Sequence, residues 1–147
     1  MAKPTTARFG KFRVLLGDGA DPEVFTAPCG FTSKSLALSK NLTDVNLPDC
    51  DDPDAAAWVG RDVQSLSAQI TGEGVLAVES VQKWQAAFDN TESINVKVEI
   101  EFSTGTLTYT GAMHLASITF GVEQGGRVTC DVEMQSDGEL VASDTIP

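Results

Sequence analysis

Two segments in the second half of the chain alternate strictly between apolar and polar residues. From Ile94 to Phe102 the even-numbered residues are large and apolar, whereas the odd-numbered ones are polar, and the same alternation recurs from Val128 to Gln135. Strict alternation is typical of a strand that buries one face only. The polar positions are Asn95, Lys97, Glu99, Glu101, Thr129, Asp131, Glu133 and Gln135. We therefore expect a sheet with one apolar face and one long, mostly acidic face.

Weaker alternation predicts further strands over residues 9–16, 24–27, 33–40, 63–71 and 106–115. The polar side of the strand over 63–71 carries Ser65, Ser67, Gln69 and Thr71. Glycine-bearing turns at 17–19 and 124–126 end the neighbouring strands. The sequence thus predicts a mainly β fold, a β-sandwich or barrel.

The apolar phase changes once inside the last meander. Leu107 and Tyr109 are odd-numbered, but Ile118 and Phe120 are even-numbered. Because side chains alternate between the two faces of a strand, a shift of one residue requires an extra residue in the ladder. We expect a β-bulge or a bend near Ala116 and Ser117.

A helical period interrupts the strands between residues 78 and 88. Its apolar residues are spaced by four, three and four positions and should pack against the sheet; they are Ala77, Val81, Trp84 and Phe88. A single amphipathic helix cannot bury its stripe alone, so it should flank the sheet.

The segment 41–57 contains two prolines and five aspartates and has no apolar period. A connection this long is uncommon in a compact domain unless it has a role, so we interpret it as a projecting loop that becomes ordered against a neighbour. Its candidate contact residues are Asp44, Asp49, Cys50, Asp51, Asp52, Asp54 and the following Trp58, which should anchor the returning loop to the core or to another subunit. The acidic spacing does not match the helix–loop–helix calcium pattern, so a partner-facing loop is favoured over a calcium site.

Composition and charge restrict the class of protein. With 147 residues, we expect a single domain over 1–147 with flexible ends at 1–6 and 138–147. The formal net charge of −11 argues against a general nucleic-acid binder. Residues 1–40 nevertheless hold six bases against three acids, and the rest holds four against eighteen. Such asymmetry suits head-to-tail self-association through Lys3, Arg8, Lys11 and Arg13, although chance and solubility give the same pattern.

The sequence contains neither a run of about 18 apolar residues, which would predict membrane insertion, nor a recognisable signal peptide. We therefore expect a cytoplasmic protein.

Catalytic chemistry is nearly absent from the sequence. His114 is the single histidine, and one histidine does not make a catalytic triad or a zinc site without partners that the sequence does not place. Cys130 lies in the apolar register and should be a buried thiol, while Cys29 and Cys50 lie in loop segments and could be thiols or a disulfide. We expect no enzyme, no metal and no cofactor.

The order of several short segments resembles the tail tube proteins, or major tail proteins, of long-tailed bacteriophages and related gene transfer agents. The resemblance spans about residues 9–140 and rests on residues 29–36 (CGFTSKSL), 48–55 (PDCDDPDA), Trp58, 61–63 (RDV), 65–67 (SLS), 72–76 (GEGVL), 109–111 (YTG) and 126–134. It implies a β-sandwich with one flanking helix and a long extended loop, six copies in a ring, and rings stacked into a hollow tube.

The resemblance also implies roles for the residues above. Ser65, Ser67, Gln69, Asn95, Lys97, Glu99, Glu101, Thr129, Asp131 and Glu133 would line a channel for DNA ejection, with Lys97 paired to a neighbouring glutamate. The loop would reach the adjacent ring, and the basic segment would meet another copy. Implied partners are further copies and other tail proteins such as the tape measure, terminator and distal tail proteins, in a virion tail assembled in the bacterial cytoplasm. The alternative is a tail-tip or carbohydrate-binding β-sandwich module. The sequence leaves contractile and non-contractile tails equally open, as it does phage and gene transfer agent.

Overall fold

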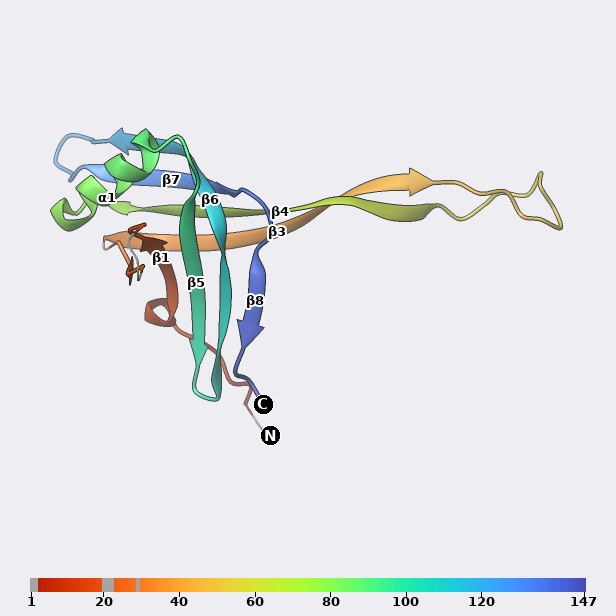
Figure 1. Ribbon diagram of the computed structural model, residues 1–147, viewed down its shortest axis with the longest axis horizontal. Coiled ribbons are helices and arrows are strands. Elements are labelled where there is room, and N and C mark those ends of the chain that lie inside the picture. Colours follow the sequence, from red (N-terminus) through yellow and green to blue (C-terminus); the bar gives the residue numbers. More distant parts are fainter. Residues whose placement is uncertain (1–2, 20–22, 29) are drawn as a thin grey trace.

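A computed structural model of the chain describes residues 3–19, 23–28 and 30–147 (Figure 1). The described part is mainly β with one α-helix, which confirms the predicted fold class. Its elements are the 3₁₀ turn η1 (Phe9–Lys11), β1 (Phe12–Gly17), β2 (Phe25–Thr26), β3 (Phe31–Val45), β4 (Gly60–Val75), α1 (Val78–Asp89), β5 (Ile94–Phe102), β6 (Gly105–Gly121), β7 (Thr129–Ser136) and β8 (Val141–Asp144).

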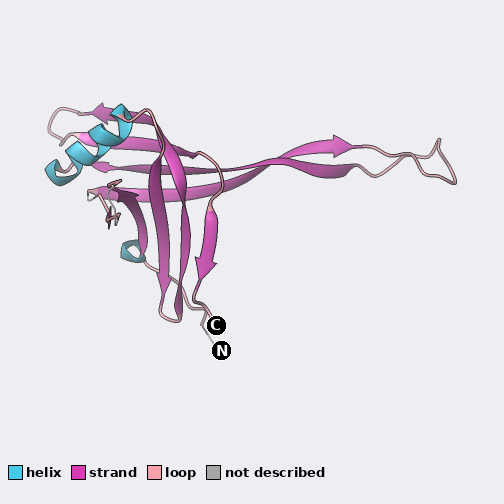
Figure 2. Cartoon of the chain, in the orientation of Figure 1, coloured by secondary structure: helices cyan, strands magenta, loops and turns pink. Residues whose placement is uncertain are grey.

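The described strands form one folded sheet in the order β2-β1-β5-β6-β7-β4-β3, and β8 also pairs with β6. All of the pairings are antiparallel. The long strand β6 belongs to two parts of the sheet, because residues 105–113 pair with β5 whereas 113–121 pair with β7. We call β1, β2, β5, β8 and 105–113 of β6 the β5 limb. We call β3, β4, β7 and 113–121 of β6 the β7 limb. Figure 2 shows the strands of the two limbs crossing.

The predicted bulge lies in the middle of β6. Pairing with β7 shifts by one residue between Leu115 and Ser117, which leaves Ala116 as the extra residue. The shift keeps apolar residues on the inner face of β6 on both sides of the bend, with Met113 and Leu115 buried before it and Ile118 half-buried after it. This prediction from the apolar phase is confirmed.

The core lies between the two limbs. Both limbs contribute buried side chains to one cluster: Val14, Leu16, Val96 and Val98 from the β5 limb, Ile70, Cys130, Val132 and Met134 from the β7 limb, and Met113 and Leu115 at their junction. Each limb therefore turns its apolar face toward the other. The polar faces of the limbs point away from this common core, and so away from each other.

Helix α1 packs on the core through Trp84. The indole is 2% exposed and meets the ring of Phe31 edge to face, with centroids 5.6 Å apart. The other buried residues of the helix are the small Ser80 and Ala87, which allow close approach to the sheet. Phe88, predicted on the buried stripe, is exposed, so that prediction is wrong. Residues 80, 84 and 87 form the buried stripe, and Phe88 lies one position further around the helix.

Strands β3 and β4 form a long hairpin that reaches away from the rest of the molecule in Figure 1. Their ladder continues to Val45 and Gly60, so the connecting loop covers 46–59 and not 41–57 as predicted. Backbone pairing carries the strands past the end of their apolar pattern, and Arg61 Nε adds a 3.1 Å contact to Asp44 Oδ1 across the hairpin. We call residues 39–66 the arm.

The C-terminal segment, predicted to be flexible, contributes β8. This strand pairs with residues 107–110 of β6. Alternation does not reveal this strand, because β8 has only four residues and all of them are exposed. Just before β8 the chain crosses Gly111 so closely that a Cβ there would lie 2.8 Å from the carbonyl oxygen of Glu139. Glycine is required at this crossing for lack of space.

Candidate functional site

The outer face of the β7 limb carries rows of small polar and acidic side chains. Directly paired residues of an antiparallel sheet lie on the same face, so the registers define these rows. One row runs Ser33, Glu73, Asp131, Thr119, the next Ser35, Thr71, Glu133, Ser117, and the third Ala37, Gln69, Gln135, His114. We call these rows, with Ser39, Ser67 and Thr129, the hydroxyl–acid face.

This face is hollowed along its middle. A shallow groove of about 400 Å³ runs over the first two rows, between Ser33 on one side and Thr119 on the other. Hydroxyl groups on the face bind one another: Ser39 Oγ lies 2.7 Å from Ser67 Oγ, and Ser35 Oγ contacts Thr71 Oγ1. The hydroxyls thus satisfy part of their hydrogen-bonding capacity within the sheet, and their short side chains lie close to its surface.

The carboxylates of this face are not neutralised by basic groups. Within the ranges that the structure describes, no ion pair involves Glu73, Asp131 or Glu133. The amide of Gln135 donates to Glu133 Oε1 at 3.1 Å, which holds that carboxylate without cancelling its charge. The face therefore presents a negative potential balanced by mobile counterions.

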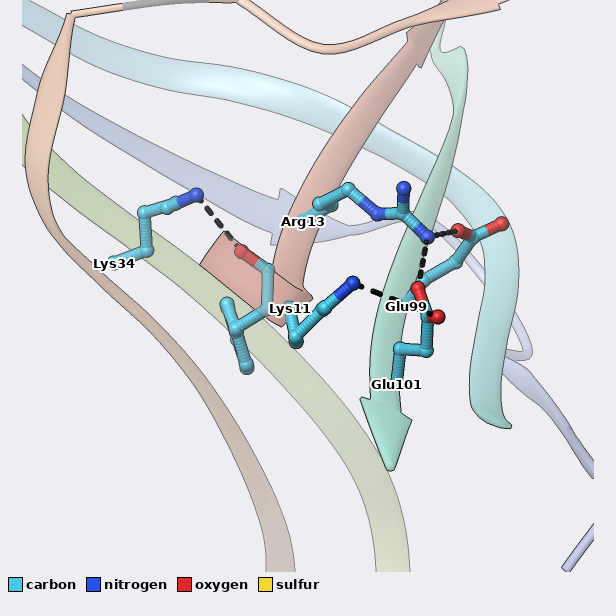
Figure 3. A network of polar contacts seen from close by, with 6 residues as sticks. Lys11, Arg13, Lys34, Glu99 and Glu101 are labelled. Carbon is cyan, nitrogen blue, oxygen red and sulfur yellow. Dashed lines mark hydrogen bonds and ion pairs between the residues drawn. The ribbon is translucent and has the colours of Figure 1, made fainter. Parts of the chain in front are cut away.

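The polar residues of β5 lie on the other limb. Arg13 of β1 donates through Nη2 to Glu99 at 2.9 Å and to Glu101 at 3.1 Å, and Lys11 lies 3.7 Å from Glu101 (Figure 3). These glutamates are thus paired within the chain. The four predicted lining residues of β5, namely Asn95, Lys97, Glu99 and Glu101, do not join the hydroxyl–acid face, because the shared core separates the two polar faces.

Lys97 has a different partner from the one expected. Its Nζ stands 4.6 Å from the ring centroid of Phe25, a cation–π contact. The predicted pairing with a glutamate is wrong, because Arg13 and Lys11 already occupy Glu99 and Glu101.

Lys34 bridges the open seam between β1 and β3. Its Nζ donates to the carbonyl oxygen of Phe12 in β1 at 2.8 Å (Figure 3). It also lies 4.6 Å from the ring centroid of Phe9. Burial, and then the nearby charge of Arg13, lowers the pKa of Lys34. One side chain from β3 therefore ties the two limbs together where no backbone ladder joins them.

The arm ends in an exposed apolar and acidic tip. Trp58 is 98% exposed, so it packs on none of the residues that the structure describes. The sequence predicted that Trp58 anchors the returning loop either to the core or to another subunit, and its exposure excludes the core. Around it Asp49, Cys50, Asp51, Asp52 and Asp54 are all exposed.

The basic N-terminal residues divide into two groups. Lys3 and Arg8 are exposed, whereas Lys11 and Arg13 are engaged with glutamates of β5. Only the first two keep their charge available for another molecule. Cys29, the other loop thiol considered above, lies outside the described residues.

Candidate metal-binding side chains are dispersed in the described part of the chain. Among the described residues no cluster of three His, Cys, Asp or Glu side chains could hold a metal ion. His114 Nε2 lies 3.3 Å from Asp137 Oδ2, and both side chains are about half exposed. No helix in the described ranges is long and apolar enough to cross a membrane.

Sequence reasoning missed part of the hydroxyl–acid face. It placed Ser67, Gln69, Thr71, Thr129, Asp131, Glu133 and Gln135 on polar faces. It did not identify the other members, which are Ser33, Ser35, Ala37, Ser39, Glu73, His114, Ser117 and Thr119. The residues of β6 could have been found, because the predicted bulge turns the odd-numbered residues after it outward. Those of β3 and β4 required knowledge of which strands pair.

Comparison with protein families gives a match over residues 7–142 to the model of phage tail tube proteins. Comparison with curated protein sequences returned no match. The fold is similar to a subunit in the tail of an empty gene transfer agent particle refined with C6 symmetry, with a TM-score of 0.73 at 20% identity over 92% of this chain and 98% of that one.

Two further structures have the same fold. The SPP1 tail tube gives a TM-score of 0.65 at 11% identity over 96% of this chain and 81% of that one. A chain in the baseplate of the anti-feeding prophage gives 0.63 at 10% identity, covering 97% of each chain.

Proposed function

The chain belongs to the phage tail tube protein family, a family of structural proteins and not of enzymes, and on that premise we propose that six copies form a ring and that rings stack into a hollow tail tube. The C6 symmetry of the similar gene transfer agent tail supports the number six. The observation that carries the proposal is the uncompensated hydroxyl–acid face on a sheet with an apolar opposite side.

The hydroxyl–acid face lines the bore in this proposal. Of the ten residues predicted to face it, Ser65, Ser67, Gln69, Thr129, Asp131 and Glu133 are retained, and Glu73, Thr71, Ser117 and Thr119 join them. The four residues of β5 are removed from the lining, since they face away from the β7 limb. Ser65 lies beside Asn41 on the arm and continues the same face outward.

A negative, hydroxyl-rich wall suits passage of DNA. Carboxylates repel phosphate, and hydroxyls offer weak, exchangeable hydrogen bonds. DNA crossing such a bore keeps its own counterions and gains no counterion-release affinity for the wall, which lysines would supply. The genome therefore slides without binding tightly.

The arm makes the contact between stacked rings. Its strand-paired part spans about seven residues of β3 beyond the body, or roughly 20 Å at strand spacing, and its tip exposes Trp58. We assign Asp44, Asp49, Cys50, Asp51, Asp52, Asp54 and Trp58 to this contact. Lys3 and Arg8 of another copy offer complementary charge, and a heterologous contact of this kind repeats without closing, as a filament requires.

The ends of such a tube need other tail proteins. Partners of the kinds named by the resemblance, a tape measure inside and terminator and distal proteins at the ends, would bind surfaces that stacking leaves open. The subunit would be made and assembled in the bacterial host cytoplasm and then remain in the tail of a phage or phage-like particle.

Electron microscopy of the purified protein tests the proposal. We expect stacked rings with six-fold symmetry and a stain-filled centre. Isolated monomers at all concentrations, with binding to glycans, would instead favour the carbohydrate-binding module. A reconstruction in which Asp131 and Glu133 face outward would contradict the lining even if tubes form.

A further inference from the structure

The carboxylates of the hydroxyl–acid face lie in one half of it. They belong to the first two rows, near the end of β4 that leads into α1; they are Glu73, Asp131 and Glu133. The groups nearer to the arm are amides, an imidazole and hydroxyls, which are Gln69, Gln135, His114, Ser39 and Ser67. We call this second group the donor band. The face therefore changes, along its strands, from acidic to hydrogen-bonding.

His114 holds a carboxylate that lies beside the donor band. Asp137 directly follows β7, and its backbone N–H donates to the carbonyl oxygen of Ala112 at 2.8 Å. Its Oδ2 lies 3.3 Å from His114 Nε2. An imidazole has two ring nitrogens, and this contact uses one of them. Both side chains are about half exposed, so the ring remains accessible to a further ligand.

His114 is also the one side chain in the described rows that can carry a positive charge. The lysines of β3 lie on the opposite side of the sheet, because Lys34 and Lys40 alternate with Ser35 and Ser39 along the strand. Carboxylates accept hydrogen bonds but do not donate them, whereas amides, hydroxyls and imidazoles donate. An anion that approaches the face is thus repelled by the acidic half and meets donors in the donor band.

We propose that the donor band is where the bore touches DNA, with phosphate oxygens accepting hydrogen bonds from His114, Gln69 and Gln135. The proposal rests on the proposed tube and locates the DNA contact within it. Polar side chains of this kind supply many of the contacts that proteins make to phosphates. Gln135 can take part although it donates to Glu133, because a side-chain amide carries two hydrogens. Contacts to phosphate carry no sequence information, as a conduit for a whole genome requires.

Stacking makes the two halves alternate along the bore. Each subunit places its acidic half toward α1 and its donor band toward the arm, so every ring adds one acidic level and one donor level. Duplex DNA carries one phosphate charge per ~1.7 Å of its axis, so phosphates face every donor level at all times. The number of contacts stays constant as the duplex slides, and each neutral hydrogen bond is weak in net terms because water offers the same bond. Contact and sliding are therefore compatible.

Acid conditions should strengthen this contact. Histidine is the side chain that ordinarily changes charge between pH 5 and 8, and a protonated imidazole binds phosphate through a charge-assisted hydrogen bond. The charged groups around the ring are Asp137, Glu133 in the neighbouring row of β7, and Glu92 where the chain enters β5. β3 and β4 present neutral residues in the row of His114. Among the described residues, the positive charge that DNA would meet at the donor band therefore comes from His114.

Moving the single histidine tests the proposal. Tubes of the parent, assembled around a short fluorescent DNA duplex, should release it roughly tenfold more slowly at about pH 5.5 than at about pH 8, the effect of one charge-assisted hydrogen bond. His114→Gln should release it at the same rate at both pH values. Ser143→His in the His114→Gln background returns a histidine on the outer face of the β5 limb and should stay insensitive to pH. A pH dependence in either variant overturns the proposal, as does equal release by the parent at both pH values.

A carboxylate in place of an amide tests the donor band at neutral pH. Gln135→Glu keeps the shape of the side chain, removes its donors and should release the duplex several-fold faster than the parent. Gln85→Glu makes the same change on α1, outside the face, and should release it like the parent. Both positions are exposed, so each variant should fold like the parent. Tubes that form but release DNA equally from both variants overturn the donor band and leave the proposed tube standing. Parent protein that forms no tubes overturns the proposed function as well.

Discussion

The guanidinium of Arg13 lies 2.9 Å from a carboxylate oxygen of Glu99, although 86 residues separate them in the chain. The contact joins β1 to β5 within the outer face of the β5 limb. It also explains why a strand as acidic as β5 is not a free negative surface. The same guanidinium group reaches Glu101, so one cation holds two carboxylates.

Replacing Arg13 with methionine should destabilise the subunit by about 1 kcal/mol, equivalent to a fall of roughly 3 °C in melting temperature. The value is modest because the side chain is partly exposed and its Nε is buried without a partner. Lys11→Met is the control, since its 3.7 Å contact is more exposed and should cost less than about 0.5 kcal/mol. Thermal melts of both variants check the order, and equal losses would contradict it.

Cys130 should make stability depend on pH in the alkaline range. Burial, and then the adjacent Asp131, raises the pKa of this thiol above its ordinary value of 9.0. The unfolded chain therefore ionises first, so the stabilising contribution is complete below pH 9.0 and is lost as pH rises through the folded pKa. Denaturant titrations give the free energy of unfolding of the parent and of Cys130→Ala. The parent value minus the variant value should fall above pH 9.0. The subtraction cancels the contribution of Lys34, whose lowered pKa also makes stability depend on pH.

Deleting Ala116 should leave the faces of β6 in place. Ala116 is the extra residue of the bulge, so without it Leu115 still faces the core, Ser117 faces outward and Ile118 faces inward. The deletion should remove the local bend and cost about 1 kcal/mol. Deleting Lys97 is the contrast, because the β5 ladder has no bulge and the loss of one residue turns the apolar side chains after it outward. Circular dichroism should show cooperative melting for the Ala116 deletion and its loss for the Lys97 deletion; an Ala116 deletion that does not melt cooperatively would show that the fold requires the bulge.

The sequence predicted elements better than it predicted their arrangement. Alternation located β5, β7 and the bulge, because these depend on which side chains face the core. The sequence did not reveal that β5 and β7 turn their acidic faces in opposite directions, since the same alternation arises on either limb of a folded sheet. Nor did it reveal that Arg13 would neutralise β5, which depends on a pairing between strands more than 80 residues apart.

Other misses have local physical causes. Phe88 was assigned to the buried stripe because it is apolar, but the small Ser80 and Ala87 face the sheet around Trp84 and leave Phe88 outside. The arm was read as a loop because its residues lose their apolar period. Backbone hydrogen bonds hold its strands together without any core.

Charge reversal in the proposed bore should impede DNA while leaving assembly intact. Asp131→Lys with Glu133→Lys places cations on the hydroxyl–acid face, where they would release phosphate counterions and retain DNA. Particles carrying the pair should eject their genomes several-fold more slowly at low salt, with recovery at high salt. Asp89→Lys with Glu92→Lys makes the same change in charge at the end of α1 and should eject normally. Equal ejection by both double variants would contradict the lining.

Removing Trp58 should shorten stacks without weakening the subunit. Its side chain is 98% exposed, so Trp58→Ala should change the free energy of unfolding by less than about 0.5 kcal/mol. If the indole is buried against the next ring, the variant loses one large apolar contact for every subunit in every stacking interface, and six such losses add up in each ring. Single rings should then outnumber long tubes in electron micrographs. Val78→Ala, another exposed apolar residue but on α1, should stack like the parent. The variant carries this single change. Tubes of the parent's length from Trp58→Ala would therefore show that the arm tip does not join rings.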